Sequence, residues 1–329
     1  MPTNVPPDYL KAEDEYRKAK TPEDKLAALG KMMALMPKHK GTEKLQADLK
    51  RRMAKLRAGE GKSATARRGG IFHVPREGAA QVILVGAPNA GKSALVNRLT
   101  RTEFAVAPYP YTTQQLQPGM MPFENIKIQL VDTPAIAEEF MESWLPGVVR
   151  NADYALVLAN LASPEVLEET ETVLRRLREG KVELVREGEV KLTPDGGARV
   201  RAMLVGTHLD QQPGAKDNGE ALRELYGERF PLALLSTESL EGLEEFRRTL
   251  FRELKIIRVY TKEPGKPPDR VNPVILPQGS VLLDFARSIH KDFAEHLKFA
   301  RIWSRDKYDG LRVPRDHVLE DEDVIEMHL

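Results

Sequence analysis

The stretch GAPNAGKS, residues 86–93, sets the architecture of the chain around it because it fits the pattern G-x-x-x-x-G-K-[ST]. An apolar run, QVILV (81–85), precedes it, and SALVNRLT (93–100), whose apolar residues have helical spacing, follows it. The glycines allow successive backbone N–H groups to turn inward, and the N-terminus of a helix adds partial positive charge. The stretch therefore predicts a phosphate-binding loop between a buried strand and a helix.

Beyond this loop, short apolar runs alternate with helical patterns, which is typical of a parallel sheet covered on both faces. A turn at Glu124-Asn125, within GMMPFENIKIQLVD (119–132), joins two of the runs as a hairpin and adds one antiparallel edge strand. The fold class that we expect is therefore α/β with a mostly parallel sheet. The runs that we assign to its strands are QVILVG (81–86), IKIQLVDT (126–133), YALVLAN (154–160), RAMLVGTH (201–208) and PLALLS (231–236).

Changes in composition divide the chain into three parts. Residues 1–70 carry helical patterns and end in a loose linker rich in Gly, Ser and Ala, where a domain boundary is expected. Residues 71–254 hold the sheet, with a small insertion at about 163–199 that contains a charged helix and a turn-rich segment. Residues 255–329 suit a small α+β module with short strands and one helix at about 279–290.

The formal net charge of +1 hides a basic segment near the N-terminus. Residues 31–70 carry twelve Lys or Arg against three Asp or Glu; of the two helical patterns, at 8–29 and 41–57, the first precedes this segment and the second lies within it. One interpretation is a surface for a polyanion such as RNA, contacted through backbone phosphates because aromatic residues are scarce nearby. The other interpretation is the solvated face of a helical hairpin, and charge alone does not separate the two.

The composition is that of a globular protein. Hydrophobic residues make up 41% and charged residues 30%, and no run approaches the ~20 apolar residues of a membrane span. The first residues lack the apolar stretch after a basic start that marks a secretory signal. The chain has no cysteine, which excludes disulfides and thiolate metal sites. We therefore expect a cytoplasmic protein that does not span a membrane.

Several polar side chains have positions suited to phosphate and Mg²⁺ chemistry. Lys92 is placed to reach the β- and γ-phosphates of a nucleotide, and the Ser93 hydroxyl to bind Mg²⁺. Asp132 ends a predicted strand, where its carboxylate can hold Mg²⁺ through a water. Between the first helix and the hairpin, a hydroxyl can close over the metal and the γ-phosphate. We assign this role to Thr113, with Thr112 as the alternative.

Two further motifs point to guanine. VGTHLD (205–210) follows the fourth predicted strand and ends in Asp210, whose carboxylate oxygens can accept hydrogen bonds from both N1–H and N2–H of guanine. Adenine offers no such donor pair, so Asp210 favours GTP over ATP. LLSTES (234–239) follows the last strand, and the backbone N–H groups of Ser236 and Thr237 can donate to the base oxygen. Together with the phosphate motifs, these predict a guanine-nucleotide site.

The motifs resemble those of the Obg and DRG (developmentally regulated GTP-binding) GTPase family in the TRAFAC class. The N-terminal evidence is GAPNAGKS, YPYTTQQLQPG and VDTPAI. The C-terminal evidence is IRVYTKEPGKPPD, PVILPQGSVLLDFARSIHKDF and LEDEDVIEMH, which resemble the TGS domain that ends DRG proteins. The resemblance implies a P-loop GTPase domain of the Obg type at 71–254, preceded by a helical hairpin and followed by a β-grasp TGS domain associated with RNA or regulatory interactions.

The resemblance also implies which residues contact the nucleotide, with departures from the family pattern at several positions. Thr207 and His208 replace the Asn and Lys of the N-K-x-D motif, where Thr can hydrogen-bond near the purine N7 and His can pack over the base. Ala135 replaces a glycine, and Ile136 stands where a GTPase usually has a water-positioning Gln. The implied GTP-binding residues are Asn89, Ala90, Gly91, Lys92, Ser93, Ala94, Asp132, Thr207, His208, Asp210, Ser236 and Thr237.

GTPases with an apolar residue after the D-x-x-G-type motif often recruit a monovalent cation through an Asn of the phosphate loop. The resemblance therefore implies that Asn89 holds potassium. Asn89, Lys92 and Thr113 make up the expected catalytic set. The alternative is that Asn89 only braces the loop.

The expected function is slow hydrolysis of GTP to GDP and phosphate by a regulatory GTPase. It would engage the ribosome or ribosomal RNA through the flanking domains, with a protein regulator as a further partner and Mg²⁺ as cofactor. One alternative is a guanine-nucleotide sensor or scaffold with negligible hydrolysis. Another is an ATPase, which Asp210 disfavours.

Overall fold

The chain forms two compact units, Met1–His73 and Val74–Leu329, in the computed structural model. In the first unit, helix α2 (Pro22–Leu35) buries Ala28, Leu29 and Met32, which share one helical face. The second predicted helix of the hairpin and nearly all of the basic segment lie outside the described residues. The structure describes residues 22–35, 74–100, 116–188, 191–193, 196–211, 213–304 and 309–328.

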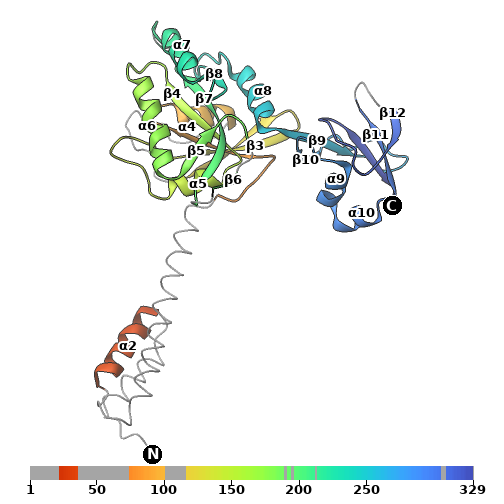
Figure 1. The fold of residues 1–329 in the computed structure, drawn as a ribbon, viewed down its shortest axis with the longest axis horizontal. Coiled ribbons are helices and arrows are strands. Elements are labelled where there is room, and N and C mark those ends of the chain that lie inside the picture. Colours follow the sequence, from red (N-terminus) through yellow and green to blue (C-terminus); the bar gives the residue numbers. More distant parts are fainter. Residues whose placement is uncertain are drawn as a thin grey trace, which may run out of the picture. The chain divides into compact units, whose positions relative to one another are not determined.

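The second unit begins with a mixed sheet whose central strands are parallel, as the sequence predicts (Figure 1). Its strand order is β2-β3-β1-β4-β7-β5, and β8 also pairs with β7. The predicted hairpin is confirmed, because β2 runs antiparallel to β3 with Glu124 and Asn125 between them. The bounds are β1 (Gln81–Gly86), β2 (Gln117–Phe123), β3 (Ile126–Asp132), β4 (Tyr154–Asn160), β5 (Val182–Val185), β7 (Ala198–Thr207) and β8 (Leu232–Leu234).

The segment at 163–199, where the sequence predicts a small insertion, is built onto the long strand β7. Helix α6 (Val166–Glu179) comes first and buries an apolar stripe that includes Val173 and Leu177. Strand β5 then pairs in parallel with the first half of β7, and β6 (Lys191–Leu192) pairs antiparallel with the same half. Strand β8 pairs in parallel with the second half of β7.

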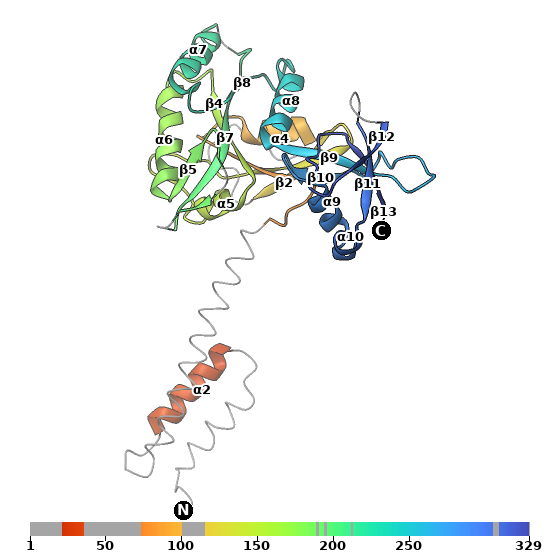
Figure 2. The same ribbon diagram turned by 45° about the vertical axis from the view of Figure 1, so that its right-hand side comes forward.

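Helices cover both faces of the sheet (Figure 2). The first core cluster contains side chains of α5, α6 and α7 against β1, β4 and β7. The second contains side chains of α4 and α8 against the other face of the same strands. Strands β1 and β4 are therefore buried on both faces, which explains their uninterrupted apolar sequences. The remaining helices of this part are α4 (Lys92–Thr100), α5 (Leu145–Asn151), α7 (Ala215–Tyr226) and α8 (Leu243–Leu254).

The C-terminal part forms a second, five-stranded sheet in the order β10-β9-β13-β11-β12. Helix α9 (Leu282–Ile289) packs Phe285 into its core. The sequence predicts one helix here, but a short second helix, α10 (Lys291–His296), follows. The break between them is at His290, whose extended backbone ends α9 and whose imidazole accepts a hydrogen bond from Asp292 N. The strands are β9 (Ile256–Thr261), β10 (Val274–Pro277), β11 (Phe299–Trp303), β12 (Asp309–Val313) and β13 (Val324–His328).

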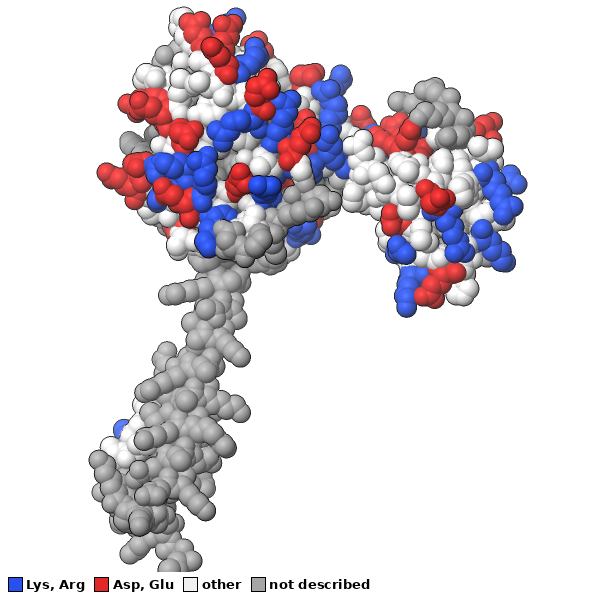
Figure 3. All heavy atoms as spheres, in the orientation of Figure 1, with Lys and Arg blue, Asp and Glu red and all other residues white. Residues whose placement is uncertain are grey.

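Charge on the described surface is mixed. On the face shown in Figure 3, acidic and basic side chains are interspersed over the part of the second unit that carries the larger sheet. The basic excess of the sequence belongs to residues 31–70, of which the structure describes only 31–35. Among the helices that the structure describes, none combines the length and the apolar character that crossing a membrane requires.

Two leucines on α7 provide a matched test of this packing. Leu222 is fully buried, whereas Leu225 is 57% exposed. Replacing Leu222 by Ala opens a cavity and should lower the free energy of unfolding by about 2–5 kcal/mol. Leu225→Ala should change it by less than about 0.5 kcal/mol. Urea unfolding followed by circular dichroism measures both values, and equal losses would contradict the placement of α7.

Candidate functional site

The predicted phosphate loop curls at the carboxyl end of β1. Asn89 and Gly91 adopt positive φ angles of 58° and 81°, and Ala90 N donates a hydrogen bond to Ala87 O at 3.3 Å. Asparagine tolerates this left-handed conformation better than most residues, and glycine adopts it without strain. The turn leads directly into α4, which begins at Lys92. The backbone therefore has the curled form that anion-binding loops need before a helix N-terminus.

Close packing at Gly91 is a second reason why glycine suits this position. A Cβ atom at this position would lie 3.2 Å from His208 Cε1 and 3.3 Å from Thr207 Oγ1. The loop therefore touches the end of β7, where the predicted base-recognition motif begins. The two halves of the predicted nucleotide site are adjacent in the fold, as their separate positions after parallel strands lead one to expect.

Lys92 is buried, and its ammonium group lies over the loop. Its Nζ donates hydrogen bonds to Gly86 O at 3.1 Å and to Ala87 O at 2.9 Å. Burial lowers the pKa of Lys92 from 10.5 to about 8, and the nearby Asp132 carboxylate opposes this shift. A desolvated cation at the mouth of an N–H-lined loop is suited to phosphate oxygens, which would supply the counter-charge that the site needs.

Ser93 and Asp132 bring two oxygen donors together. The Ser93 hydroxyl donates a hydrogen bond to Asp132 Oδ2, and Asp132 is fully buried at the end of β3. Hydroxyl and carboxylate oxygens are ligands that Mg²⁺ prefers, and Mg²⁺ commonly uses few protein ligands together with phosphate and water. The Ser93 hydroxyl oxygen and the Asp132 carboxylate are therefore a pair of oxygen ligands that fits Mg²⁺. The other predicted metal ligand, Thr113, and its alternative Thr112 lie outside the described residues.

A neighbouring residue that the sequence analysis missed helps to hold Asp132. Thr133 is buried, and its hydroxyl donates to Leu84 O of β1 at 2.6 Å. This bond ties the end of β3 to the strand that enters the phosphate loop. The only signal in the sequence was a Thr directly after the Asp, which is too common to be informative.

Ile136 belongs to the hydrophobic core. Its side chain is completely buried in the cluster with Val85 and Val131, and its backbone N donates to Gly86 O at 3.1 Å. The side chain is therefore directed away from any bound phosphate and cannot orient water. Ala135 is also buried, and nothing in the structure explains why alanine replaces glycine there.

Thr207 connects the base-recognition strand to the phosphate loop. Its buried hydroxyl lies 3.0 Å from Ala90 O, 3.2 Å from Ala159 O and 2.9 Å from His208 Nδ1. One hydroxyl proton can serve only one carbonyl at a time, while the oxygen can accept from Nδ1–H. The hydroxyl is thus engaged by protein groups of the phosphate loop, β4 and His208, and its predicted hydrogen bond near the purine N7 stays a prediction.

His208 adopts a left-handed backbone conformation with φ 59°, which turns its ring toward Gly91. Burial lowers the pKa of His208, and the negative charges of Asp210 and Glu238 oppose the shift. Burial, the larger effect, therefore favours the neutral imidazole. A neutral flat ring at this position can cover a base without adding charge.

The predicted base-recognition loops lie beside each other. Asp210 is exposed in the turn after β7, and Leu209 N in the same turn donates to Leu235 O at 3.3 Å. Ser236 is buried, and its Oγ accepts hydrogen bonds from Glu238 N at 3.1 Å and Ser239 N at 3.0 Å. The hydroxyl thereby shapes the loop that contains Thr237. The Leu209–Leu235 bond therefore places the turn that carries Asp210 beside the loop that contains Thr237.

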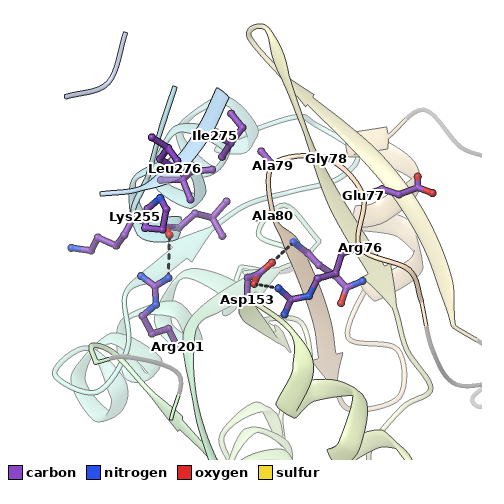
Figure 4. Close-up of a pocket in the computed structure, with 14 residues that line it drawn as sticks. Arg76, Glu77, Gly78, Ala79, Ala80, Asp153, Arg201, Lys255, Ile275 and Leu276 are labelled. Atoms are coloured by element: carbon purple, nitrogen blue, oxygen red, sulfur yellow. Dashed lines mark hydrogen bonds and ion pairs between the residues drawn. The ribbon is translucent and has the colours of Figure 1, made fainter. Parts of the chain in front are cut away.

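A separate pocket of about 370 Å³ lies near the opposite, amino ends of the strands (Figure 4). Arg76 pairs with Asp153 at 2.8 Å, and Arg201 donates to the carbonyl oxygens of Glu253 and Leu254 at 3.1 Å each. These charged groups are engaged with protein atoms. The candidate site is therefore at the carboxyl ends of the strands.

Two family models match the chain. One, described as a 50S ribosome-binding GTPase, matches residues 81–186, and the TGS domain model matches residues 257–328. These ranges fall in the larger and the smaller sheet, respectively.

Three relatives each match 92% of the chain. An uncharacterized GTP-binding protein of Methanocaldococcus jannaschii is 26% identical and is covered over 92% of its length. Ribosome-interacting GTPase 1 of Saccharomyces cerevisiae is 29% identical, covered over 97%. Developmentally-regulated GTP-binding protein 1 of Xenopus laevis is 27% identical, covered over 98%. The similarity thus extends to both flanking parts as well as the larger sheet.

The lowered pKa of Lys92 predicts how stability depends on pH. Between about pH 8 and pH 10.5, the unfolded chain binds more protons than the native state, so the free energy of unfolding rises with pH. The contribution is roughly 3 kcal/mol across this window. Urea unfolding of the nucleotide-free protein and of Lys92→Met over this range measures it. Stability of the wild type relative to the variant should rise with pH, and parallel curves would contradict the assignment.

Proposed function

We propose that the chain is a GTP-binding protein of the DRG type, like its relatives over 92% of its length, and that its nucleotide state controls engagement with the ribosome or ribosomal RNA. The protein is a GTP hydrolase with a TGS domain. The observation that carries the proposal is the curled phosphate loop with the buried Lys92 above it and the Ser93–Asp132 pair beside it. These groups suit a triphosphate with its metal.

In the proposed mechanism, protein groups position the phosphates and neutralise their charge. Lys92 binds the β- and γ-phosphates, and backbone N–H groups of Asn89 to Ala94 surround the β-phosphate. Ser93, Asp132 and Thr113 would hold Mg²⁺, which supplies positive charge to the phosphate oxygens when bound. Ile136 cannot act as a base or position water in this arrangement, because it is an apolar core residue. Intrinsic hydrolysis is therefore slow and is stimulated by a protein regulator or the ribosome.

Guanine recognition is proposed for the two loops at the end of β7 and β8. Asp210 accepts hydrogen bonds from N1–H and N2–H, and the backbone of Ser236 and Thr237 donates to the base oxygen. His208 packs over the base, while Thr207 holds the Ala90 carbonyl and keeps the phosphate loop beside the base. In place of the Asn and Lys of the N-K-x-D motif, the hydrogen bond between the Thr207 hydroxyl and Ala90 O keeps the base-recognition strand beside the phosphate loop.

The flanking parts are proposed to bind the ribosome or its RNA in the cytoplasm. Support comes from the description of the matched GTPase family and from the name of the yeast relative. The basic residues of 31–70 suit contact with backbone phosphates. The competing function is a guanine-nucleotide sensor or scaffold that binds nucleotide without hydrolysing it.

A single-turnover assay with radiolabelled GTP tests the proposed function. The wild type should hydrolyse GTP slowly, and Lys92→Ala should abolish hydrolysis because it removes the cation at the phosphates.

Asp210→Asn should weaken GTP binding by roughly 10- to 100-fold and favour xanthosine triphosphate, whose C2 oxygen can accept from the new amide. Absence of hydrolysis with and without ribosomes would support the sensor, and an unchanged base preference would refute the role of Asp210.

Turnover in potassium and sodium buffers tests the proposed cation role of Asn89. If Asn89 and phosphate oxygens hold potassium, hydrolysis should be faster in potassium by on the order of tenfold or more, the effect of one preorganised charge. Asn89→Asp is the control, since Asp also tolerates the φ of 58° at this position. The variant should lose the difference between buffers. Equal rates for the wild type in both buffers would leave Asn89 with only the bracing role.

A further inference from the structure

The turn of the β2–β3 hairpin is bound by side chains of the TGS domain. Glu124 forms an ion pair with Arg258 of β9, and Asn125 Nδ2 donates to the Tyr260 hydroxyl at 2.8 Å and to Arg270 O at 3.0 Å. Arg258 Nη1 also lies 3.3 Å from Asn125 Oδ1. Both residues of the turn are therefore held by the smaller sheet.

Arg258 is fixed on its own side by several bonds. Its side chain is only 4% exposed, and it forms a two-pronged pair with Asp321, from Nε at 3.1 Å and from Nη2 at 2.7 Å. The guanidinium also lies 5.0 Å from the ring of Phe251, which is stacked on Phe123 of the hairpin at 4.8 Å. Arg258 thus joins the hairpin, α8 and the TGS domain at one point.

A second connection restricts how the two sheets can move. Helix α8 ends at Leu254 and β9 begins at Ile256, so Lys255, with φ 54°, is the whole link. Arg201 of β7 binds the carbonyl oxygens of Glu253 and Leu254 at the end of α8. Figure 4 shows Arg201 beneath Lys255, with Ile275 and Leu276 of β10 nearby. Because the covalent link is so short, displacement of the hairpin turn changes the orientation of β9.

The other end of the hairpin lies at the nucleotide site. Its ladder has seven residue pairs, from Gln117–Asp132 to Phe123–Ile126, without a bulge. It therefore spans roughly 20 Å from Asp132 to the turn. Strand β2 follows the segment 101–115, which contains Thr113, and it is the edge strand of the sheet. Strand β3 is fixed to β1, so β2 is the more displaceable partner.

We propose that Arg258 is a positioning residue for the nucleotide site, acting through the β2–β3 hairpin. Resting on the proposed function, this makes the hairpin the element that couples GTP or GDP at one end to the TGS domain at the other. Binding linkage is reciprocal, so whatever holds the TGS domain in one orientation also changes the relative affinity for GTP and GDP.

The ion pairs suggest a variant that separates coupling from folding. Glu124 is 56% exposed, whereas Asp321 and Glu322 on the TGS side are 32% and 23% exposed. Glu124→Gln leaves the two-pronged pair between Arg258 and Asp321 intact. Because the Gln is largely solvated, it also leaves no uncompensated buried charge. The variant therefore removes the ion pair at the turn, while the Asn125 contacts remain and the TGS domain stays folded.

The test is calorimetric titration of the full chain with GDP and with a non-hydrolysable GTP analogue and Mg²⁺. The readout is the ratio of the two affinities. We expect Glu124→Gln and Arg258→Gln each to change this ratio about fivefold or more, in the same direction. The double variant should change the affinity ratio no more than Arg258→Gln alone does. Glu326→Gln is the control, since it breaks the Lys262–Glu326 pair inside the TGS domain and should leave the ratio unchanged.

Each other outcome has a definite meaning. An unchanged ratio in a folded Glu124→Gln protein, with folding checked by thermal unfolding, overturns the inference. So does an effect of Glu124→Gln that persists in the Arg258→Gln background, or an equal effect of Glu326→Gln. If the wild type binds neither nucleotide, the proposed function fails and this inference fails with it. Normal binding with an unchanged ratio refutes the coupling alone.

Discussion

The contact between the end of β7 and the phosphate loop is the constraint on which the site depends. Thr207 holds the Ala90 carbonyl, and Gly91 is the residue that leaves room for Thr207 and His208. Since β1 and β7 are separated in the sheet only by β4, this contact brings the phosphate and base motifs to one edge. A side chain at position 91 would require Thr207 or His208 to shift by a few tenths of an ångström.

The local features of the site could be predicted from the sequence because each depends on neighbouring residues. The phosphate loop, the hairpin turn and the strand that ends at Asp132 were all evident from short patterns. The partner of the Thr207 hydroxyl was not, because Ala90 lies 117 residues away and contributes only a backbone carbonyl. The role of Arg258 was hidden in the same way: it lies in the TGS-like stretch IRVYTKEPGKPPD and Glu124 in the predicted hairpin turn, but the two are 134 residues apart and neither pattern indicates that they pair.

The absence of a polar side chain at position 136 now has a structural reason. Ile136 completes the core beneath the loop, so a Gln placed there by substitution would have to leave the core to act on water. The chemistry that remains consists of positioned charge at the phosphates, and the structure offers it from Lys92 and from the oxygen pair that suits Mg²⁺. In our proposal, hydrolysis at such a site stays slow until the ribosome or a protein regulator stimulates it.

Co-sedimentation of the full chain with purified ribosomal subunits tests most directly whether nucleotide state controls engagement. The measurement compares the fraction of protein in the ribosomal pellet with Mg²⁺ and a non-hydrolysable GTP analogue, with GDP, and without nucleotide. Our account predicts more protein in the pellet with the GTP analogue than with GDP. Equal pelleting in all three conditions would contradict it.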